Sequence, residues 1–448
     1  MRMFSKKHTP SFQFSSLIHL GGLLAVLVII ALSILSPFNQ AAQRNGSAAA
    51  RGDPALQDLV AVNNQISAEN ARTLGVGWVR FNYFAWNVVE PQPGQWNWGP
   101  PDQWAKQAQA AGLQVLAFLG YTPPWAAAVA SAKAVSPPKS VSDWQGYVEQ
   151  TVTRYTSPPF NIRYFQIWNE PAQGGGFWAG TDQQYVDLVY LPAAKIIRQH
   201  GGYVVFGGWN SGSTLQELNN VLNYHNAWQW TDIVDVHYRP LSDIQTLYSQ
   251  WVANGKCRGV WETEMGYTAE PGAASSIYSR ALYWALQTGW NDPNEFKLFW
   301  YAAAGGDARS LMTFSPTGPQ LDDEGKHLAV LAQVLGQGTL STFTQFATAP
   351  PAGSGANAWA IGYGVGSNRV VINFLMDRAF FQAHTSVQAS ATLRGRPSRV
   401  KLISGLGKSW DLPNQGAGGR VQVNVPFRNG LDDCPNCKGV QGYLVLDQ

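Results

Sequence analysis

The strongest constraint on the fold is a regular recurrence of short apolar strands between residues 54 and 338. The strands end near residues 80, 120, 168, 208, 237, 264 and 300, and helical patterns fill the intervals. Strands that alternate with helices indicate a parallel sheet, and the regular spacing favours a closed (β/α)8 TIM barrel over an open sheet. We expect the eight strands at residues 59–63, 77–82, 114–120, 162–168, 203–210, 233–238, 260–264 and 296–301.

Two of these strands end in a glutamate. The stretch 161–171 runs through apolar and aromatic residues to Glu170, and Pro171 ends it because a residue before proline avoids the helical region. The stretch 259–267 likewise ends a strand with Glu264. Barrel enzymes carry their sites at the carboxyl ends of the strands. The sequence therefore predicts both glutamates at the barrel mouth, separated by three βα units of about 31 residues each.

A pair of carboxyl groups is what glycoside hydrolysis requires, because one protonates the leaving oxygen and the other attacks the anomeric carbon. Here Trp-Asn-Glu-Pro (168–171) and Trp-Glu-Thr-Glu-Met-Gly (261–266) resemble the strand-four and strand-seven motifs of the clan A glycoside hydrolases. Residues 78–104 resemble the corresponding part of clan A enzymes related to family 39. The resemblance implies a retaining enzyme on a (β/α)8 barrel, with Glu170 as acid/base and Glu264 as nucleophile.

The same resemblance implies roles for further residues. Arg80, at the end of the second strand, matches the clan arginine that supports the nucleophile, and a nearby guanidinium keeps a carboxyl ionised. Asn169 matches the residue that binds the sugar 2-hydroxyl, and Trp300 matches the tryptophan beneath that sugar. His237 matches a histidine of the sixth strand.

Aromatic residues are abundant, with 19 tryptophans in 448 residues. Such rings offer flat apolar faces for sugars as well as ordinary core packing. Trp125 lies in the proline-rich loop after the third strand, and Trp209 lies at the end of the fifth. We expect both, together with Tyr238, to contact a carbohydrate substrate.

The sixth strand departs from the clan pattern. Relatives commonly carry a tyrosine two residues after the histidine, and that tyrosine touches the nucleophile. Here Arg239 stands at that position, and Tyr238 comes one residue earlier. Either the strand ends in a bulge or Arg239 has taken the role.

Glu262 is the rival of Glu264 for the role of nucleophile. Residues two apart on a strand share a face, so we expect Glu262 one layer lower, roughly 6.6 Å from the mouth. A site at the mouth favours Glu264. Glu262 then needs a buried partner, for which Arg239 and Asp235 are candidates.

The amino terminus carries a nearly uninterrupted apolar run at residues 17–35, about the length needed to cross a bilayer. Basic residues precede it, which predicts a cytoplasmic amino terminus and an exported body. We expect residues 1–36 to form an uncleaved membrane anchor and residues 37–53 a flexible tether. A cleaved signal peptide is the alternative, although residues 39–43 make a poor cleavage site.

Residues 339–448 differ from the barrel, because alternating apolar runs are separated by Gly, Pro, Asn and Ser turns. This pattern predicts a small antiparallel β-sandwich, which either supports the barrel or binds polysaccharide. Cys434 and Cys437 are expected to form a short-loop disulfide and Cys257 to be a buried free thiol. A zinc site would need two more ligands, so we expect no metal. We also expect no cofactor.

The charge pattern limits the kinds of partner that the protein is expected to bind. The formal net charge is +3, and no basic patch or charge run points to nucleic acid. We therefore predict a retaining β-glycoside hydrolase that acts on extracellular or cell-surface carbohydrate. A non-catalytic polysaccharide-binding barrel and a transglycosylase that uses the same two glutamates are the alternatives, and no feature indicates an oligomeric state.

Overall fold

The computed structural model describes residues 54–448, except residues 65, 267–271, 291, 305–309, 317, 337, 350–357, 428, 429, 436 and 438. The apolar run at residues 17–35 and the tether at residues 37–53 lie outside the described residues. None of the helices within the described part of the chain is long and apolar enough to cross a membrane.

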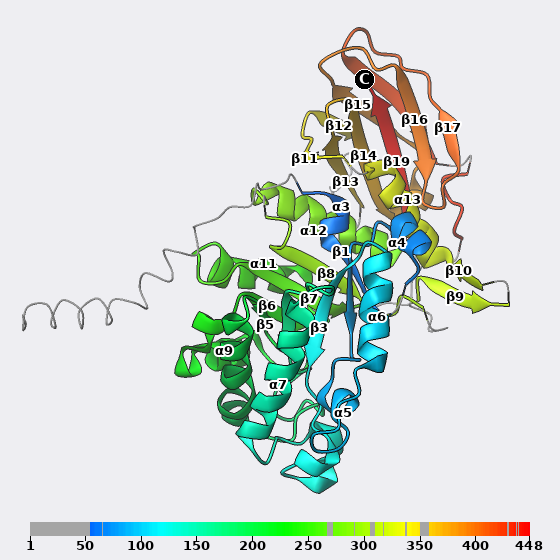
Figure 1. Ribbon diagram of the computed structural model, residues 1–448. Coiled ribbons are helices and arrows are strands. Elements are labelled where there is room, and N and C mark those ends of the chain that lie inside the picture. The colour runs from blue at the N-terminus through cyan, green and yellow to red at the C-terminus, as the bar shows by residue number, and fades with distance from the viewer. Residues whose placement is uncertain are drawn as a thin grey trace, which may run out of the picture. The chain divides into compact units, whose positions relative to one another are not determined.

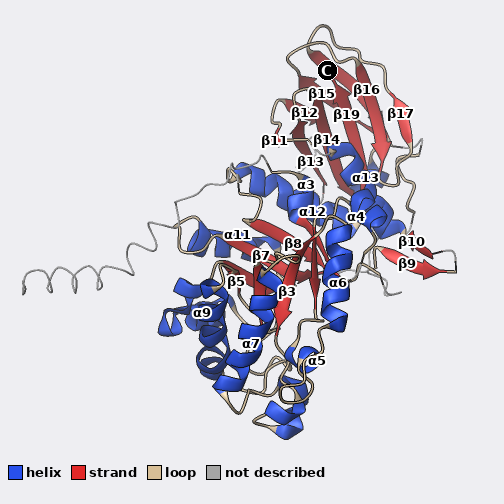
Figure 2. Cartoon of the chain, in the orientation of Figure 1, coloured by secondary structure: helices blue, strands red, loops and turns tan. Residues whose placement is uncertain are grey.

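Eight parallel strands close into a barrel, each pairing with its neighbours in sequence and β1 pairing with β8 (Figures 1 and 2). This confirms the (β/α)8 barrel expected from the strand recurrence. The strands are β1 Val60–Asn63, β2 Trp78–Phe81, β3 Gln114–Leu119, β4 Tyr164–Ile167, β5 Tyr203–Val205, β6 Ile233–His237, β7 Gly259–Met265 and β8 Phe296–Trp300.

Helices follow the strands around the outside of the barrel (Figure 2). In the longest described helix, α7 (Val141–Thr156), the apolar residues at helical spacing are buried, which packs the helix against the barrel. The Ser140 hydroxyl caps its start by accepting a hydrogen bond from the Asp143 amide. The other helices are α3 Leu56–Leu59, α4 Ala68–Leu74, α5 Trp86–Val89, α6 Gly99–Ala110, η1 Pro124–Ala126, η2 Ala130–Val135, α8 Asp182–Gln184, η3 Tyr185–Tyr190, α9 Leu191–Gln199, α10 Leu215–Asn223, η4 Tyr224–Trp230, α11 Leu241–Leu247, η5 Tyr248–Val252, α12 Ala273–Gln287, α13 Asp323–Leu335 and α14 Arg378–Ala383.

An apolar layer fills the lower barrel, and each strand contributes one residue to it. The eight residues are Ala61, Trp78, Leu116, Tyr164, Val205, Ile233, Trp261 and Phe299. Since side chains on a strand point inward at every second position, the next inward residues up several strands are polar. Arg80, Gln166 and Asp235 stand two residues beyond members of this layer. The barrel thus has an apolar floor beneath a polar upper layer.

The carboxyl-terminal part is a β-sandwich, as expected. A six-stranded sheet has the order β11-β13-β14-β19-β16-β17, and a three-stranded sheet has the order β12-β15-β18. Its strands are β11 Leu340–Thr342, β12 Phe346–Ala349, β13 Ala358–Val365, β14 Arg369–Asp377, β15 Ser386–Thr392, β16 Arg399–Ser404, β17 Ser409–Asp411, β18 Arg420–Pro426 and β19 Gly439–Asp447, and a separate hairpin, β9 Met312–Ser315 with β10 Gly318–Leu321, precedes α13.

The central strands β14 and β19 of the six-stranded sheet are buried on both faces. In β14, Val370 and Ile372 belong to the core between the two sheets, whereas Val371 belongs to the core of the barrel. Polar contacts reinforce the second face, because Asn373 donates to the Ser279 hydroxyl of α12 at 2.8 Å. One face of this sheet therefore packs on the second sheet of the sandwich and the other face packs on the barrel side.

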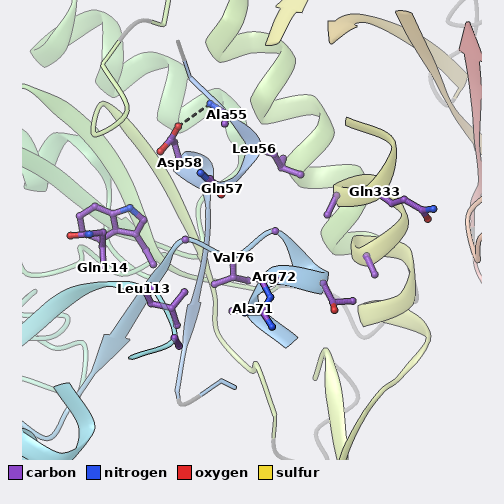
Figure 3. Close-up of a pocket in the computed structure, with 18 of the residues that line it drawn as sticks. Ala55, Leu56, Gln57, Asp58, Ala71, Arg72, Val76, Leu113, Gln114 and Gln333 are labelled. Atoms are coloured by element: carbon purple, nitrogen blue, oxygen red, sulfur yellow. Dashed lines mark hydrogen bonds between the residues drawn. The ribbon is translucent and has the colours of Figure 1, made fainter. Parts of the chain in front are cut away.

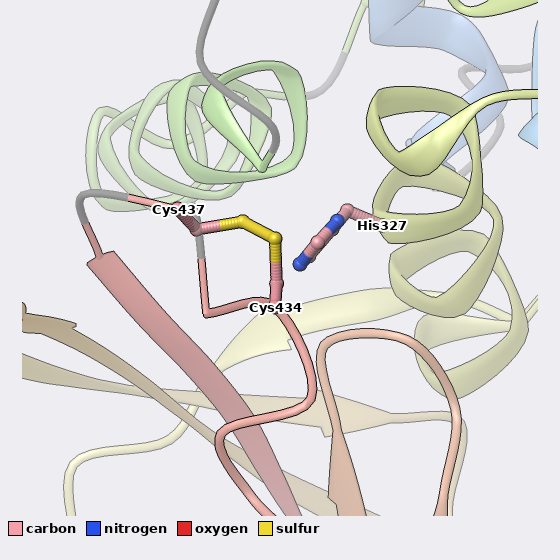
Figure 4. A group of neighbouring side chains, drawn as sticks. All are labelled: His327, Cys434 and Cys437. Carbon is pink, nitrogen blue, oxygen red and sulfur yellow. A yellow bond between two sulfur atoms is a disulfide. The ribbon is translucent and has the colours of Figure 1, made fainter.

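The cysteines lie as the sequence indicates. Cys434 and Cys437 form a disulfide, and Cys257 is a buried free thiol. His327 of α13 lies beside the disulfide (Figure 4), and its Nδ1 donates to the Asp323 carbonyl at 2.6 Å. The two sulfur atoms are bonded to each other. Together with His327 they form a contact between α13 and the loop before β19.

Candidate active site

The backbone is strained where the strands end. Tyr121, Trp168, Glu170 and Tyr238 all have positive φ angles, of 64°, 72°, 47° and 53°. They lie within three residues of the ends of β3, β4 and β6, at the carboxyl-terminal mouth of the barrel. Non-glycine residues adopt this conformation rarely, and such strain gathers at functional sites. The strained positions therefore mark the mouth as the candidate site.

Glu170 is held just beyond β4. Its backbone amide donates to the Gly207 carbonyl at 2.8 Å, which ties this turn to the end of β5. Its Oε1 lies 3.0 Å from Nδ1 of His237, a fully buried residue at the end of β6. The Glu170 side chain keeps 10 % of its surface exposed, so the carboxyl is accessible from the mouth.

Glu264 lies at the end of β7 and is held in its ionised form. Nη1 of Arg80 lies 2.7 Å from Oε1, and the Tyr238 hydroxyl donates to Oε2 at 3.1 Å. Burial alone would raise the pKa of this carboxyl. The positive potential of His237 and Arg80, and the hydrogen bonds from Arg80 and Tyr238, outweigh burial and hold the pKa of Glu264 below its ordinary value.

Arg80 joins four strands at one point. Its Nε donates to Gln166 at 2.5 Å, and its Nη1 donates to Asn63 at 3.1 Å as well as to Glu264. Its Nη2 donates to Oδ1 of Asn169 at 2.6 Å. One rigid guanidinium therefore sets the positions of both Glu264 and Asn169.

The two glutamates face each other across the mouth. One oxygen from each carboxyl and a ring nitrogen of His237 lie within 4.8 Å of one another. Such a triad has the donor types that hold a divalent cation. Here Arg80 and Tyr238 already contact the oxygens of Glu264. The same arrangement also fits two carboxyl groups that act on one bond of a substrate.

The pairing of β6 with β7 shows how Tyr238 reaches the nucleophile although Arg239 stands where relatives carry a tyrosine. Val236 pairs with Glu262 and His237 with Glu264, so Thr263 is an extra residue in β7. With its positive φ, Tyr238 reaches Glu264 one position early. The bulge therefore lies in β7 and not at the end of the sixth strand, where the first alternative placed it. The Arg239 guanidinium contacts the Asn210 and Ser213 carbonyls and Asp243.

The same bulge corrects the expectation for Glu262. Trp261 belongs to the inner barrel layer, and the Thr263 hydroxyl also points inward to Asp235. Glu262, which lies between them, therefore faces the other side of the strand and does not share a face with Glu264. One buried partner of Glu262 is the backbone amide of Arg239, which donates to Oε1 at 2.7 Å.

Two of the rings expected to contact a sugar have no exposed surface in this structure. Trp300 and Trp209 are both fully buried. Trp300 packs in the core of the barrel and beside Gly266, and the Trp209 indole donates to the Thr214 carbonyl at 3.2 Å. A ring without accessible surface offers no face to a sugar. Trp125 is half-buried, with its indole donating to the Glu90 carbonyl.

Other aromatic residues are exposed at strand ends. Tyr301 directly follows β8, is 39 % exposed, and has its ring 6.1 Å from that of Tyr238. Tyr83 and Phe177 are exposed in the loops after β2 and β4. These rings replace Trp300 and Trp209 as candidates for sugar stacking. The sequence offered one signal for Tyr301, its position next to Trp300. Neighbouring residues on a strand point to opposite faces, but the sequence alone does not show which of the two points into the barrel.

Sequence reasoning also missed the polar residues that surround Arg80 and His237. Asn63 and Gln166 accept hydrogen bonds from Arg80, and Thr263 contacts His237. Asp235 was considered only as a partner for Glu262, whereas it contacts Thr263. Counting inward positions up each strand from the barrel floor would have found Gln166 and Asp235.

A cavity of about 920 Å³ lies at the opposite end of the barrel (Figure 3). Its lining includes Gly77 and Gln114, which stand at the beginnings of β2 and β3, together with residues of α3, α4 and α13. Barrel enzymes place their chemistry at the carboxyl ends of the strands. This cavity is therefore separate from the candidate site.

Sequence comparisons find similarity to glycoside hydrolases over a limited stretch. The model of a family described as beta-galactosidase, glycoside hydrolase family 42, matches residues 62–136. A beta-xylosidase from Caldicellulosiruptor saccharolyticus is 33 % identical over 78 residues. That match spans only 16 % of this chain and 16 % of the relative.

Solved structures share the fold over most of the chain. A family 39 glycoside hydrolase from Bacteroides cellulosilyticus WH2 has a TM-score of 0.60 and 13 % identity, covering 88 % of this chain and 81 % of that one. A GH30 endoxylanase from Clostridium papyrosolvens C71 has a TM-score of 0.58 and 15 % identity, covering 87 % and 95 %. Together these comparisons confirm the resemblance of this chain to the clan A glycoside hydrolases.

Replacing Arg80 tests the electrostatics of the site. Arg80→Met leaves the buried Glu264 carboxylate without its cation, which should lower the free energy of unfolding at pH 7 by about 3–5 kcal/mol. In the folded wild type the pKa of Glu264 is lowered from 4.5, so its ionisation stabilises the protein above that pH. This contribution is lost as the pH falls through the lowered pKa.

The measurement is the thermal midpoint of both proteins between pH 3 and pH 7. The difference between them should be largest near neutrality and shrink at acidic pH. Arg399→Met is the control, because the Arg399–Asp411 ion pair is exposed and contributes little. A difference that does not vary with pH would contradict the assigned ion pair.

Proposed function

We propose that this protein is a retaining β-glycoside hydrolase that works by double displacement. The observation that carries the proposal is the close approach of the Glu170 and Glu264 carboxyl groups, with oxygens within 4.8 Å of each other. Retaining glycosidases place their two carboxyl groups about 5–5.5 Å apart, whereas inverting enzymes need about 6.5–9.5 Å to admit a water molecule between them and the sugar.

The environments of the two carboxyl groups support a division of roles. Glu264 accepts hydrogen bonds from Arg80 and Tyr238, and its lowered pKa makes it the ionised nucleophile. Among the described residues no arginine contacts Glu170, which instead contacts His237, a residue able to share a proton. Pairs of titratable groups in unlike environments are how one site supplies both an acid and a nucleophile.

The reaction then proceeds in two displacements. Glu170 donates its proton to the glycosidic oxygen while an oxygen of Glu264 bonds to the anomeric carbon, and the bond to the leaving group breaks. The covalent ester neutralises Glu264. Glu170, now a carboxylate, removes a proton from water as the water attacks the same carbon, which restores both residues and retains the β configuration. Asn169, oriented by Arg80, is positioned to bind the 2-hydroxyl.

The substrate class that we propose is a β-linked oligo- or polysaccharide. The relatives include proteins described as beta-xylosidase, beta-galactosidase and endoxylanase, so β-xylosides and β-galactosides are the first substrates to test. Exposed Tyr83, Phe177 and Tyr301 provide aromatic faces for several sugar units.

The acid/base role of Glu170 is tested with Glu170→Gln on aryl and natural β-xylosides and β-galactosides. Turnover of natural glycosides should fall about 10²–10⁴-fold, because the leaving oxygen is no longer protonated. Aryl glycosides with acidic leaving groups should lose less in the first step, and added azide should restore turnover with the β configuration kept. Glu69→Gln, at an exposed acid of α4, is the control. Equal loss on both substrate types without azide rescue would refute the role.

The nucleophile is tested by trapping. A 2-deoxy-2-fluoro β-glycoside of the sugar that is turned over should inactivate the enzyme, and peptide mapping should place the adduct on Glu264. An adduct on Glu262, or a product of inverted configuration, would overturn the mechanism. Products longer than the substrate would identify a transglycosylase, and tight binding of polysaccharide without turnover would identify a binding barrel.

We propose that the barrel lies outside the cytoplasm, held by the apolar segment at residues 17–35. The basic residues before that segment and its length support this topology. Protease added to intact cells should digest the barrel, and the mature protein should begin at or near Met1. A mature terminus between about residues 37 and 50 would make the segment a signal peptide, and a barrel protected from protease would contradict export.

A further inference from the structure

A chain of hydrogen bonds continues from Glu170 into the barrel. Nδ1 of His237 lies 3.0 Å from Glu170, and Nε2 lies 2.9 Å from the Thr263 hydroxyl. The Thr263 hydroxyl in turn lies 2.7 Å from Oδ2 of Asp235. His237, Thr263 and Asp235 are completely buried, so these four groups exchange hydrogen bonds with one another in place of water.

When His237 is neutral and carries a single N–H, the donors in this chain must all point the same way. If Asp235 is ionised, the Thr263 hydroxyl donates to it and accepts the Nε2 hydrogen of His237. A neutral His237 then presents the Nδ1 lone pair, so Glu170 carries a proton and donates it. If Asp235 is protonated, every bond reverses: Thr263 donates to Nε2, and the Nδ1 hydrogen of His237 donates to a Glu170 carboxylate.

We propose that Asp235, acting through Thr263, determines which ring nitrogen of His237 carries the proton and thereby whether Glu170 is held as an acid or as a carboxylate. The proposal rests on the proposed function of Glu170. The two arrangements contain the same number of protons, because reversal of three hydrogen bonds moves one proton from the Asp235 carboxyl to Glu170. Asp235 and Thr263 are therefore positioning residues, and neither touches the substrate.

The surroundings of Asp235 allow both arrangements near neutral pH. Burial raises the pKa of Asp235 to about 7, although His237, Thr263 and Arg80 act to lower it. The groups that face it are His237 on its own strand, Thr263 on β7, Arg80 on β2 and, from the outer helices, Tyr185 of η3. On the other side of His237, Nδ1 lies 3.0 Å from Glu170 and 3.7 Å from Glu264.

Asp235 also has a structural role that a suitable variant preserves. Its Oδ1 accepts the backbone amide of Thr263 at 3.1 Å, which secures the extra residue of the β7 bulge. Asp235→Asn keeps this acceptor and replaces Oδ2 by an amide that only donates. The variant fixes one direction: the amide donates to Thr263, Thr263 donates to Nε2, and Nδ1–H of His237 faces Glu170 permanently.

The first test does not depend on activity. Nitrogen-15 NMR of the full chain labelled at its seven histidines, with His237 assigned from a His237→Asn variant, reports the protonation of each ring nitrogen. At pH 7, close to the pKa of Asp235, we expect the Nε2 signal of wild-type His237 to include the N–H form from molecules with ionised Asp235, and the signal of Asp235→Asn to be that of a lone pair alone. Identical Nε2 signals in the two proteins, with each folded by its thermal midpoint, would overturn the proposal even if no glycoside is hydrolysed.

The second test is the pH profile of kcat/KM on a natural glycoside. Asp235→Asn should move the alkaline limb, which reports protonated Glu170, to lower pH by about one unit, because a permanent N–H donor favours the carboxylate. Thr263→Val, which breaks the chain, should also move this limb, and Thr263→Ser should restore the wild-type profile.

The matched control is Thr151→Val. Thr151 is a fully buried threonine of α7, and within the described residues its hydroxyl has no hydrogen-bond partner. It should leave the profile unchanged. An unchanged alkaline limb in both Asp235→Asn and Thr263→Val, in an enzyme that is otherwise active, would exclude the relay while leaving the role of Glu170 intact.

Discussion

The site depends on one buried guanidinium. Arg80 meets oxygen atoms from β1, from β4 and the turn after it, and from β7, and its burial leaves these contacts little competition from water. A charge buried in this manner is tolerated only when its donors are satisfied, so the acceptors and the arginine fix one another. The barrel mouth is assembled around this cation, which together with His237 and Tyr238 keeps Glu264 ionised.

The apolar floor explains the behaviour of the polar layer above it. Eight side chains, one from each strand, close the barrel below Asp235 and His237. Water cannot reach these groups from that side, so their charges are set by one another. Desolvation raises the pKa of Asp235, while Arg80 and His237 hold that of Glu264 down. The pKa values of these two carboxyl groups therefore shift in opposite directions because the groups around them differ.

The sequence predicts the barrel, the sandwich, the disulfide and the placing of Glu170, Glu264 and Arg80 at one mouth, because strand recurrence and strand ends are local signals. It does not predict the bulge at Thr263, which arises from pairing with neighbouring strands and reverses the expected face of Glu262. The burial of Trp300 has a different cause, because alternation along β8 does not show whether Trp300 or Tyr301 points inward. Strand alternation is reliable only until the register slips.

The irregular backbone at the mouth shows how the barrel maintains this geometry. Positive φ angles at Glu170 and Tyr238 each cost on the order of 1–3 kcal/mol. Strand-end hydrogen bonds offset that cost, since the Glu170 amide donates to Gly207 and the Tyr238 amide donates to the Glu264 carbonyl, both at 2.8 Å. In a regular strand, Tyr238 would point away from Glu264. The strained backbone directs the tyrosine hydroxyl to the carboxylate. The site therefore requires a rigid barrel below it that holds the strained backbone in place.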